Sequence, residues 1–181
     1  MNKESNHLLD GIRVIDAASF IAGPSAATIM SDYGAEVIKI EPESGDSLRN
    51  LIINGRMPEG KENYCWELTS RNKKSISLNL KDERAHKILV NLIKDADVFI
   101  TNMPFPIRKK LRITSEDVRP HNNKIIYASL TGYGEVGPDA DRTAYDSMAW
   151  WARSGLMDFV RPSEKSSVAW STPGMGDHPT G

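Results

Sequence analysis

The chain has 181 residues, and its 23 Lys and Arg side chains nearly balance 24 Asp and Glu, which leaves a net charge of −1. This length fits one domain with an ordinary core, and the charge gives no indication of nucleic acid or a membrane surface as a partner. No apolar run approaches the roughly 20 residues that span a bilayer, the polar start is no signal peptide, and the single Cys65 cannot form an internal disulfide, so we expect a cytoplasmic protein.

Short apolar runs alternate along the chain with longer segments of helical periodicity. The apolar runs predict strands at 12–17, 35–41, 74–80, 97–101 and 124–130. Helices are predicted at 24–34, at 81–96, between the fourth and fifth strands, and at 144–157. This alternation favours βαβ units and therefore an α/β fold, a Rossmann-like, doubly wound, mainly parallel sheet with helices on both faces.

Two stretches fit no regular element. Residues 42–66 are rich in Gly, Pro and charge, and loops of that length in compact domains are usually functional or mobile. The tail 161–181 contains a strand-like "SVAW" and closes on "GMGDHPTG". Pro179 is expected to stop any regular element, which leaves Asp177 on a tight turn with its carboxylate held toward a ligand. Asp and Gly also favour turns that have no function, so spacing alone does not decide whether Asp177 is a functional residue or a plain turn residue.

The carboxyl ends of the predicted strands are the expected place for a ligand. Small residues at 19–24 follow the first strand and lead into a helix N-terminus, which can hold an anion. Two basic runs, 70–74 and 108–112, favour a polyanionic small ligand. A dinucleotide is not expected, because the turn lacks the G-x-G-x-x-G that seats a pyrophosphate and Pro24 removes an N–H donor.

Six motifs occur together in a fixed order, and they point to one family. They lie at residues 8–49, 71–81, 95–102, 125–138, 144–146 and 176–177. As a set they resemble the class III CoA-transferase family, of the formyl-CoA transferase and carnitine CoA-transferase type. "NKKSISLNLK", "WARSGLM" and the terminal "GDH" look most like the 2-hydroxyacid CoA-transferases that act on phenyllactate or 2-hydroxyisocaproate.

The resemblance implies that Asp177 is the nucleophile of CoA transfer from an acyl-CoA donor to a carboxylic acid. The reaction would pass through an aspartyl-CoA thioester, which conserves the thioester energy in covalent intermediates. Water must be excluded, and backbone N–H groups beside the flanking glycines would stabilise an oxyanion. Whether His178 orients the acceptor acid or is a plain turn residue stays open.

The resemblance also implies that CoA binds as a substrate, with no metal and no permanently bound cofactor. The positions that match the family's CoA contacts are Ile21, Ala22, Leu78, Lys81, Asn102, Met103, Lys110, Arg142 and Tyr145. Three positions depart from the family pattern. Lys110 replaces a phosphate-binding Arg and keeps its charge without the bidentate geometry, Arg142 lies one position from a family lysine, and Pro42 replaces an Arg.

The 2-methylacyl-CoA racemases of the same family are the closest alternative. They carry Gly-His-Asp where this chain has 144–146, and proton exchange beside a thioester needs a second base such as that His. Tyr145, with an ordinary pKa near ~10, is a poor substitute. Asp146 is expected to cap or brace the helix that follows it.

The family's members are considerably longer than this chain. The resemblance therefore implies that residues 1–181 are the N-terminal part of the large CoA-binding domain, with the small domain and the C-terminal part absent. We expect an interlocked homodimer at full length, or a second chain that supplies the other half. The alternative from a different class is a truncated CoA-binding module with no activity alone.

Overall fold

The computed structural model of the chain describes residues 7–49 and 60–181. Its five strands are all parallel and form one sheet in the order β3–β2–β1–β4–β5. Their bounds are Arg13–Asp16 (β1), Glu36–Glu41 (β2), Lys74–Ser77 (β3), Val98–Thr101 (β4) and Ile126–Ser129 (β5). Each lies inside a predicted strand, and the predicted Rossmann-like fold is confirmed. The strand order reverses between β1 and β4, the point at which such sheets bind ligands.

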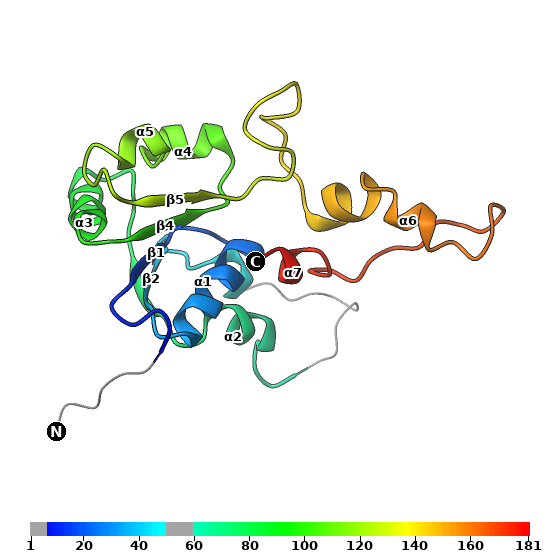
Figure 1. The fold of residues 1–181 in the computed structure, drawn as a ribbon, viewed down its shortest axis with the longest axis horizontal. Helices are drawn as coiled ribbons and strands as arrows, with labels where there is room; N and C mark the ends of the chain where they lie inside the picture. Colours follow the sequence, from blue (N-terminus) through cyan, green and yellow to red (C-terminus); the bar gives the residue numbers. More distant parts are fainter. Residues whose placement is uncertain (1–6, 50–59) are drawn as a thin grey trace.

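Helices cover both faces of the sheet (Figure 1). One face carries α1 (Ala22–Asp32) and α2 (Tyr64–Ser70), and the other carries α3 (Glu83–Lys94), α4 (Phe105–Leu111) and α5 (Ser115–Val118). Because side chains alternate along a strand, neighbouring residues of β1 enter different cores. Ile15 packs with Phe99 and Leu89 in the core under α3, whereas Val14 packs with Ala27 in the core under α1.

Local sequence explains where the two longest helices lie. The Asp82 carboxylate accepts the N–H of Arg84 at 2.8 Å and so caps the start of α3. Helix α1 begins at Ala22, two residues before its prediction, so Pro24 lies in the first turn, where its missing N–H has little cost. The helix lies close to β1 because residue 23 is glycine: a Cβ there would lie 2.4 Å from the Cβ of Ala18.

The stretch 42–66, predicted to be irregular, contains regular structure in its described part. A 3-10 helix, η1 (Ser47–Arg49), follows β2, and α2 begins at Tyr64. The side chain of Asn63 accepts the N–H of Trp66 at 3.1 Å and caps α2. Residues 50–59 of this stretch lie outside the described residues.

The predicted helix at 144–157 is wrong as a single element. A π-helix, η2 (Ser147–Ala152), is followed by a break and a short helix, α6 (Leu156–Phe159). Gly155, with φ of 84°, adopts the left-handed conformation at the break, which ends a helix. The strand-like "SVAW" of the tail forms no strand, and it pairs with no strand of the sheet.

Residues 131–181, called the arm below, leave the sheet and return to it (Figure 1). The arm carries η2 and α6 outward and then brings α7 (Asp177–Thr180) back against α1. Most of its large apolar side chains are open to solvent, and Phe159 and Trp170 are 86% and 81% exposed. Trp151 is buried, and its indole N–H donates to the carbonyl of Ala169 at 2.8 Å, which joins the outgoing and returning halves.

Across the described part of the chain, no helix has the length and apolar character needed to cross a bilayer.

Candidate active site

The return of the arm places Asp177 beside the carboxyl edge of the sheet. Helix α7 packs on the first turn of α1, which directly follows β1. A Cβ on Gly174 would lie 2.9 Å from Cδ1 of Ile21, and a Cβ on Gly181 would lie 2.2 Å from the carbonyl oxygen of Ala22. Glycine therefore permits the close contact between the segment that carries Asp177 and the first turn of α1.

The prediction that Pro179 stops any regular element is wrong. Asp177–Thr180 form one helical turn that includes Pro179. Proline is tolerated there because the first-turn N–H groups have no partner inside the helix. Asp177 is thus the first residue of a short helix, and its neighbour His178 donates its backbone N–H to Gly174 at 3.1 Å.

Asp146 joins the outgoing half of the arm to the residue that precedes Asp177. One carboxylate oxygen accepts the N–H of Ser147 at 2.8 Å and caps η2, which confirms the capping role predicted for Asp146. The other oxygen accepts the N–H of Gly176 at 3.0 Å. Two carboxylates, those of Asp146 and Asp177, are therefore held in one site.

This arrangement changes the acidity of Asp177. Burial raises the pKa of its carboxyl group, and the negative charge of Asp146 raises it further, to about 6. No Lys, Arg or His in the described ranges pairs with Asp177 as a compensating cation. At neutral pH the group is ionised, and its raised pKa makes it a stronger base than an ordinary surface carboxylate.

The loop between β1 and α1 lies at the point where the strand order reverses. Asn102, which follows β4, accepts the N–H of Ser19 at 2.9 Å and donates to the carbonyl of Ser19 at 2.7 Å. Asn102 and the small-residue loop therefore meet at this edge of the sheet. In the same loop Phe20 packs edge-on against Tyr145 of the arm, with ring centroids 6.0 Å apart. The structure thus brings the loop, Asn102 and Tyr145 to one edge together with Asp177.

The other predicted CoA-binding residues are spread more widely. The Leu78 side chain lies in the core, so only its backbone is available, and its N–H donates to the carbonyl of Glu41 at 2.8 Å. Met103 packs partly against the same core, and Lys81 is exposed after β3. Lys110 is exposed in the last turn of α4.

Arg142 pairs with Asp139 at 2.9 Å within the arm. No hydrogen bond or ion pair between described residues joins Lys81, Lys110 or Arg142 to Asp177. CoA contacts at these three positions stay predictions, as does a role for His178.

Sequence analysis missed a cluster of buried charges beneath the loop, called the buried charge cluster below. It consists of Asp16, Lys39, Asp46 and Lys73, whose side chains are at most 2% exposed. Lys39 lies 3.1 Å from Asp46 and 3.7 Å from Asp16, and Lys73 lies 2.9 Å from Asp16. Asp16 and Lys39 are register partners on β1 and β2. The signal was a charged residue beside apolar residues in each strand, Asp16 after Val14 and Ile15 in β1 and Lys39 between Ile38 and Ile40 in β2.

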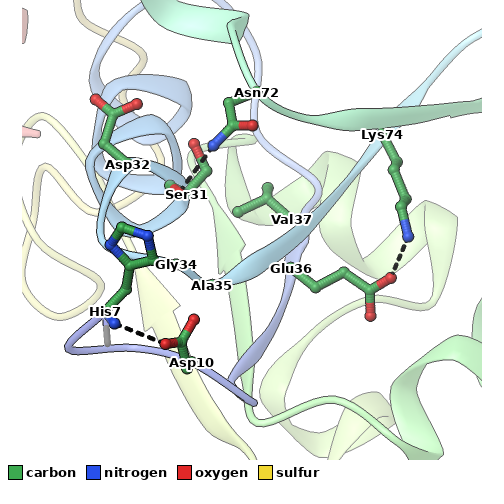
Figure 2. Close-up of a pocket in the computed structure, with 10 residues that line it drawn as sticks. All are labelled: His7, Asp10, Ser31, Asp32, Gly34, Ala35, Glu36, Val37, Asn72 and Lys74. Carbon is green, nitrogen blue, oxygen red and sulfur yellow. Dashed lines mark hydrogen bonds and ion pairs between the residues drawn. The ribbon is translucent and has the colours of Figure 1, made fainter. Parts of the chain in front are cut away.

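A cavity of about 630 Å³ lies at the opposite edge of the sheet (Figure 2). It is bordered by the first residues of β2 and β3, Glu36 and Lys74, which form an ion pair. Asp10 in its wall accepts the backbone N–H of His7 at 2.7 Å. The charged groups of this cavity already have protein partners, and nowhere in the described ranges do three potential ligands group to hold a metal ion. We therefore assign the site to the carboxyl edge.

The fold and the site define a doubly wound α/β domain with a half-buried carboxylate of raised pKa at the carboxyl edge of its sheet. The chain belongs to CoA-transferase family III, whose model matches residues 9–181. It is 39% identical over 181 residues to the cinnamoyl-CoA:phenyllactate CoA-transferase of Clostridium sporogenes, covering 99% of this chain and 43% of that protein. It is 37% identical over 175 residues to the (R)-2-hydroxy-4-methylpentanoate CoA-transferase of Clostridioides difficile, covering 96% of this chain and 44% of that protein.

A solved structure shows the same fold. Rv3272 from Mycobacterium tuberculosis, in its orthorhombic form, matches with a TM-score of 0.83 and 31% identity, covering 96% of this chain and 48% of that one. The chain thus spans less than half the length of these relatives. The resemblance drawn from six motifs is confirmed at the level of the family.

Proposed function

We propose that the protein that contains this chain transfers CoA from an acyl-CoA to a carboxylic acid, with Asp177 as its nucleophile. The observation that carries the proposal is the position of Asp177, whose half-buried carboxylate lies beside Asp146 on the segment that packs against the first turn of α1. Its pKa is raised to about 6, and no cation among the described residues pairs with it. Its place at the carboxyl edge of the sheet, in a chain of this family, supports the same chemistry.

The reaction needs four nucleophilic attacks, and each of the first three forms the intermediate on which the next one acts. Asp177 attacks the donor thioester and forms a mixed anhydride while CoA leaves as the thiolate. The thiolate attacks the aspartyl carbonyl, releases the donor acid and leaves an aspartyl-CoA thioester. The acceptor carboxylate attacks that thioester, which gives a second anhydride and free thiolate. The thiolate then attacks the acceptor's carbonyl, which yields the new acyl-CoA and frees Asp177.

Each attack develops negative charge on a carbonyl oxygen, and backbone N–H groups near Asp177 can stabilise it. Ile21, which precedes α1, contributes no side-chain cap, so among the described residues nothing caps the N–H groups of Ala22 and Gly23, which can donate to a ligand. The N–H of Gly176 is bound to Asp146 and is not available. We therefore assign the oxyanion contact to the start of α1 rather than to the glycines of the tail.

The acceptor that we propose is a 2-hydroxy acid, as in the names of the two relatives. Residues 1–181 would form the first part of the CoA-binding domain. The remaining residues of the site would come from a second part of the protein, in a homodimer or from a second chain. CoA is substrate, and no permanently bound cofactor is part of the proposal. The racemase alternative lacks support at Tyr145, a phenol packed edge-on against Phe20 rather than a base.

The test replaces each carboxylate of the pair in the complete enzyme. Asp177→Asn keeps the shape of the side chain but removes the anionic nucleophile, so the transfer rate should fall by about 10³-fold or more. Asp146→Asn loses one of its two hydrogen bonds and should lower the rate by only about tenfold. The rates would be measured by chromatography of the acyl-CoA products. Near-normal transfer by Asp177→Asn, with none by Asp146→Asn, would contradict the assignment.

A further inference from the structure

The loop between β1 and α1 has an unusual backbone conformation at Phe20. Its φ is +62°, in the left-handed region, which a bulky side chain adopts rarely and only when its surroundings impose it. Phe20 directly precedes Ile21, which lies against Gly174 of the arm. The conformation at Phe20 therefore sets the direction in which the chain enters the first turn of α1, and with it the surface on which α7 rests.

Side chains from other elements hold both backbone groups of Ala18 and of Ser19 and the N–H of Phe20. Lys39 donates to the carbonyl of Ala18 at 3.0 Å, and Asp16 accepts the N–H of Ala18 at 3.1 Å. Asp46 accepts the N–H of Phe20 itself at 3.3 Å. Asn102 holds both backbone groups of Ser19, as described above. Three of these side chains belong to the buried charge cluster.

The charges in the buried charge cluster call for an explanation beyond stability. Removing ions from water is costly, and well-packed apolar residues in their place are often as stable or more stable. What apolar residues cannot do is bind a carbonyl oxygen and an N–H group in one loop. Lys39 and Asp46 do this together, 3.1 Å from each other. Asp46 is itself held, since its second contact to the backbone is the N–H of Leu48 at 2.9 Å.

We propose that Asp46, oriented by Lys39, is a positioning residue for CoA transfer: it keeps Phe20 in the left-handed conformation and thereby places the first turn of α1 against the segment that carries Asp177. This inference rests on the proposed function, because it concerns the geometry of the same site. Asp46 touches neither Asp177 nor any reacting atom, and it acts through the backbone of Phe20.

The test measures whether the loss of Asp46 still lowers the transfer rate when residue 20 can adopt the left-handed conformation without the hydrogen bond from its N–H to Asp46. Glycine does so at no steric cost. In the complete enzyme, Asp46→Ala should lower kcat/KM by about 10- to 100-fold, as expected for a lost hydrogen bond to a charged group. In a Phe20→Gly background, which also lacks the Tyr145 contact, the same substitution should cost less than about threefold. Asp32→Ala, which removes a surface ion pair with Arg71, is the matched control and should leave the rate unchanged.

An equal loss from Asp46→Ala in both backgrounds would overturn the proposal, since Asp46 would then act through general stability. A second measurement needs no variant and holds even where Asp46→Ala does not fold. Amide hydrogen exchange of the wild-type enzyme, resolved to single residues, should show the Phe20 N–H protected. If the Phe20 N–H exchanged as fast as that of the exposed Gly137, this would contradict the proposal that Asp46 keeps Phe20 in its conformation. Absence of transfer by the wild type would instead contradict the proposed function.

Discussion

The sheet region, residues 7–130, and the arm change the pKa of a carboxyl group in opposite directions. In the sheet region, burial alone would raise the pKa of Glu41, but hydrogen bonds from Arg49, Ser75 and the backbone of Asp46 outweigh burial and lower it to about 2. In the arm, burial and the charge of Asp146 both raise the pKa of Asp177, to about 6. In the sheet region, hydrogen bonds and an ion pair stabilise the ionised carboxylate of Glu41, whereas Asp177 has no cationic partner among the described residues.

The two regions also differ in what holds them in place. The sheet region buries apolar side chains on both faces of its strands, in two cores. Of the large apolar side chains in the arm, all of whose residues are described, Trp151 is the buried one. The position of Asp177 therefore depends on the close contacts of Gly174 and Gly181 with the start of α1. It also depends on the hydrogen bond from the Gly176 N–H to Asp146. Stability and reactivity are separable in this chain, and the predictions below test that separation.

The largest effect is expected from a core substitution in the sheet region. Phe99 is fully buried and stacks on Tyr127, with ring centroids 5.5 Å apart. Phe99→Ala should lower the free energy of unfolding by about 3–5 kcal/mol, because it leaves a cavity in a packed core. The matched change in the arm is Phe159→Ala, at a side chain that is 86% exposed, and it should change stability by less than about 0.5 kcal/mol. Chemical denaturation of the complete enzyme measures both, and comparable losses would show that the arm is not independent of the core.

The next effect should appear in activity rather than stability. A Cβ on Gly176 would lie 2.7 Å from two ring atoms of Trp150, so Gly176→Ala must displace the residue before Asp177. A displacement of this kind costs about 100-fold in transfer rate, while the unfolding midpoint changes little. Adding Trp150→Gly removes the ring and also the Cβ of residue 150, which would lie 2.9 Å away, and should restore most of the rate. Full activity of Gly176→Ala alone, measured by steady-state kinetics, would show that the arm tolerates movement at Gly176.

The smallest effect is a shift of the pH profile. Asp177 must be ionised to attack, so below pH 6 the transfer rate should fall about tenfold per pH unit as the carboxylate takes up a proton. Asp146→Asn removes the charge that contributes to the raised pKa of Asp177, so the acidic limb should move toward lower pH. It should not reach the ordinary carboxyl value, because burial, the larger cause, remains. A profile that stays in place or moves to higher pH in this variant would contradict the pairing of the two carboxylates.

Sequence predicted the sheet region well and the arm poorly, for a physical reason. The five strands followed from short apolar runs, and their parallel direction followed from the helices that alternate with them. The arm is shaped by contacts between distant residues. The N–H of Gly176 binds Asp146, which lies 30 residues earlier in the chain, and no local sequence pattern predicts such a bond. The helix predicted at 144–157 is a π-helix that breaks before Gly155. Asp177 was found through its resemblance to a family, because Gly-Asp spacing alone fits a plain turn.

The central claim is that Asp177 carries CoA during turnover, and trapping tests it most directly. The complete enzyme would be mixed with an acyl-CoA donor and treated with hydroxylamine, which converts a thioester or anhydride to a hydroxamate under conditions that leave free carboxylates unchanged. Peptide mass spectrometry would then locate the modification. The account predicts a hydroxamate on Asp177 and on no other residue, formed only when the acyl-CoA is present. A hydroxamate on Asp146, or none on Asp177 while transfer proceeds, would contradict it.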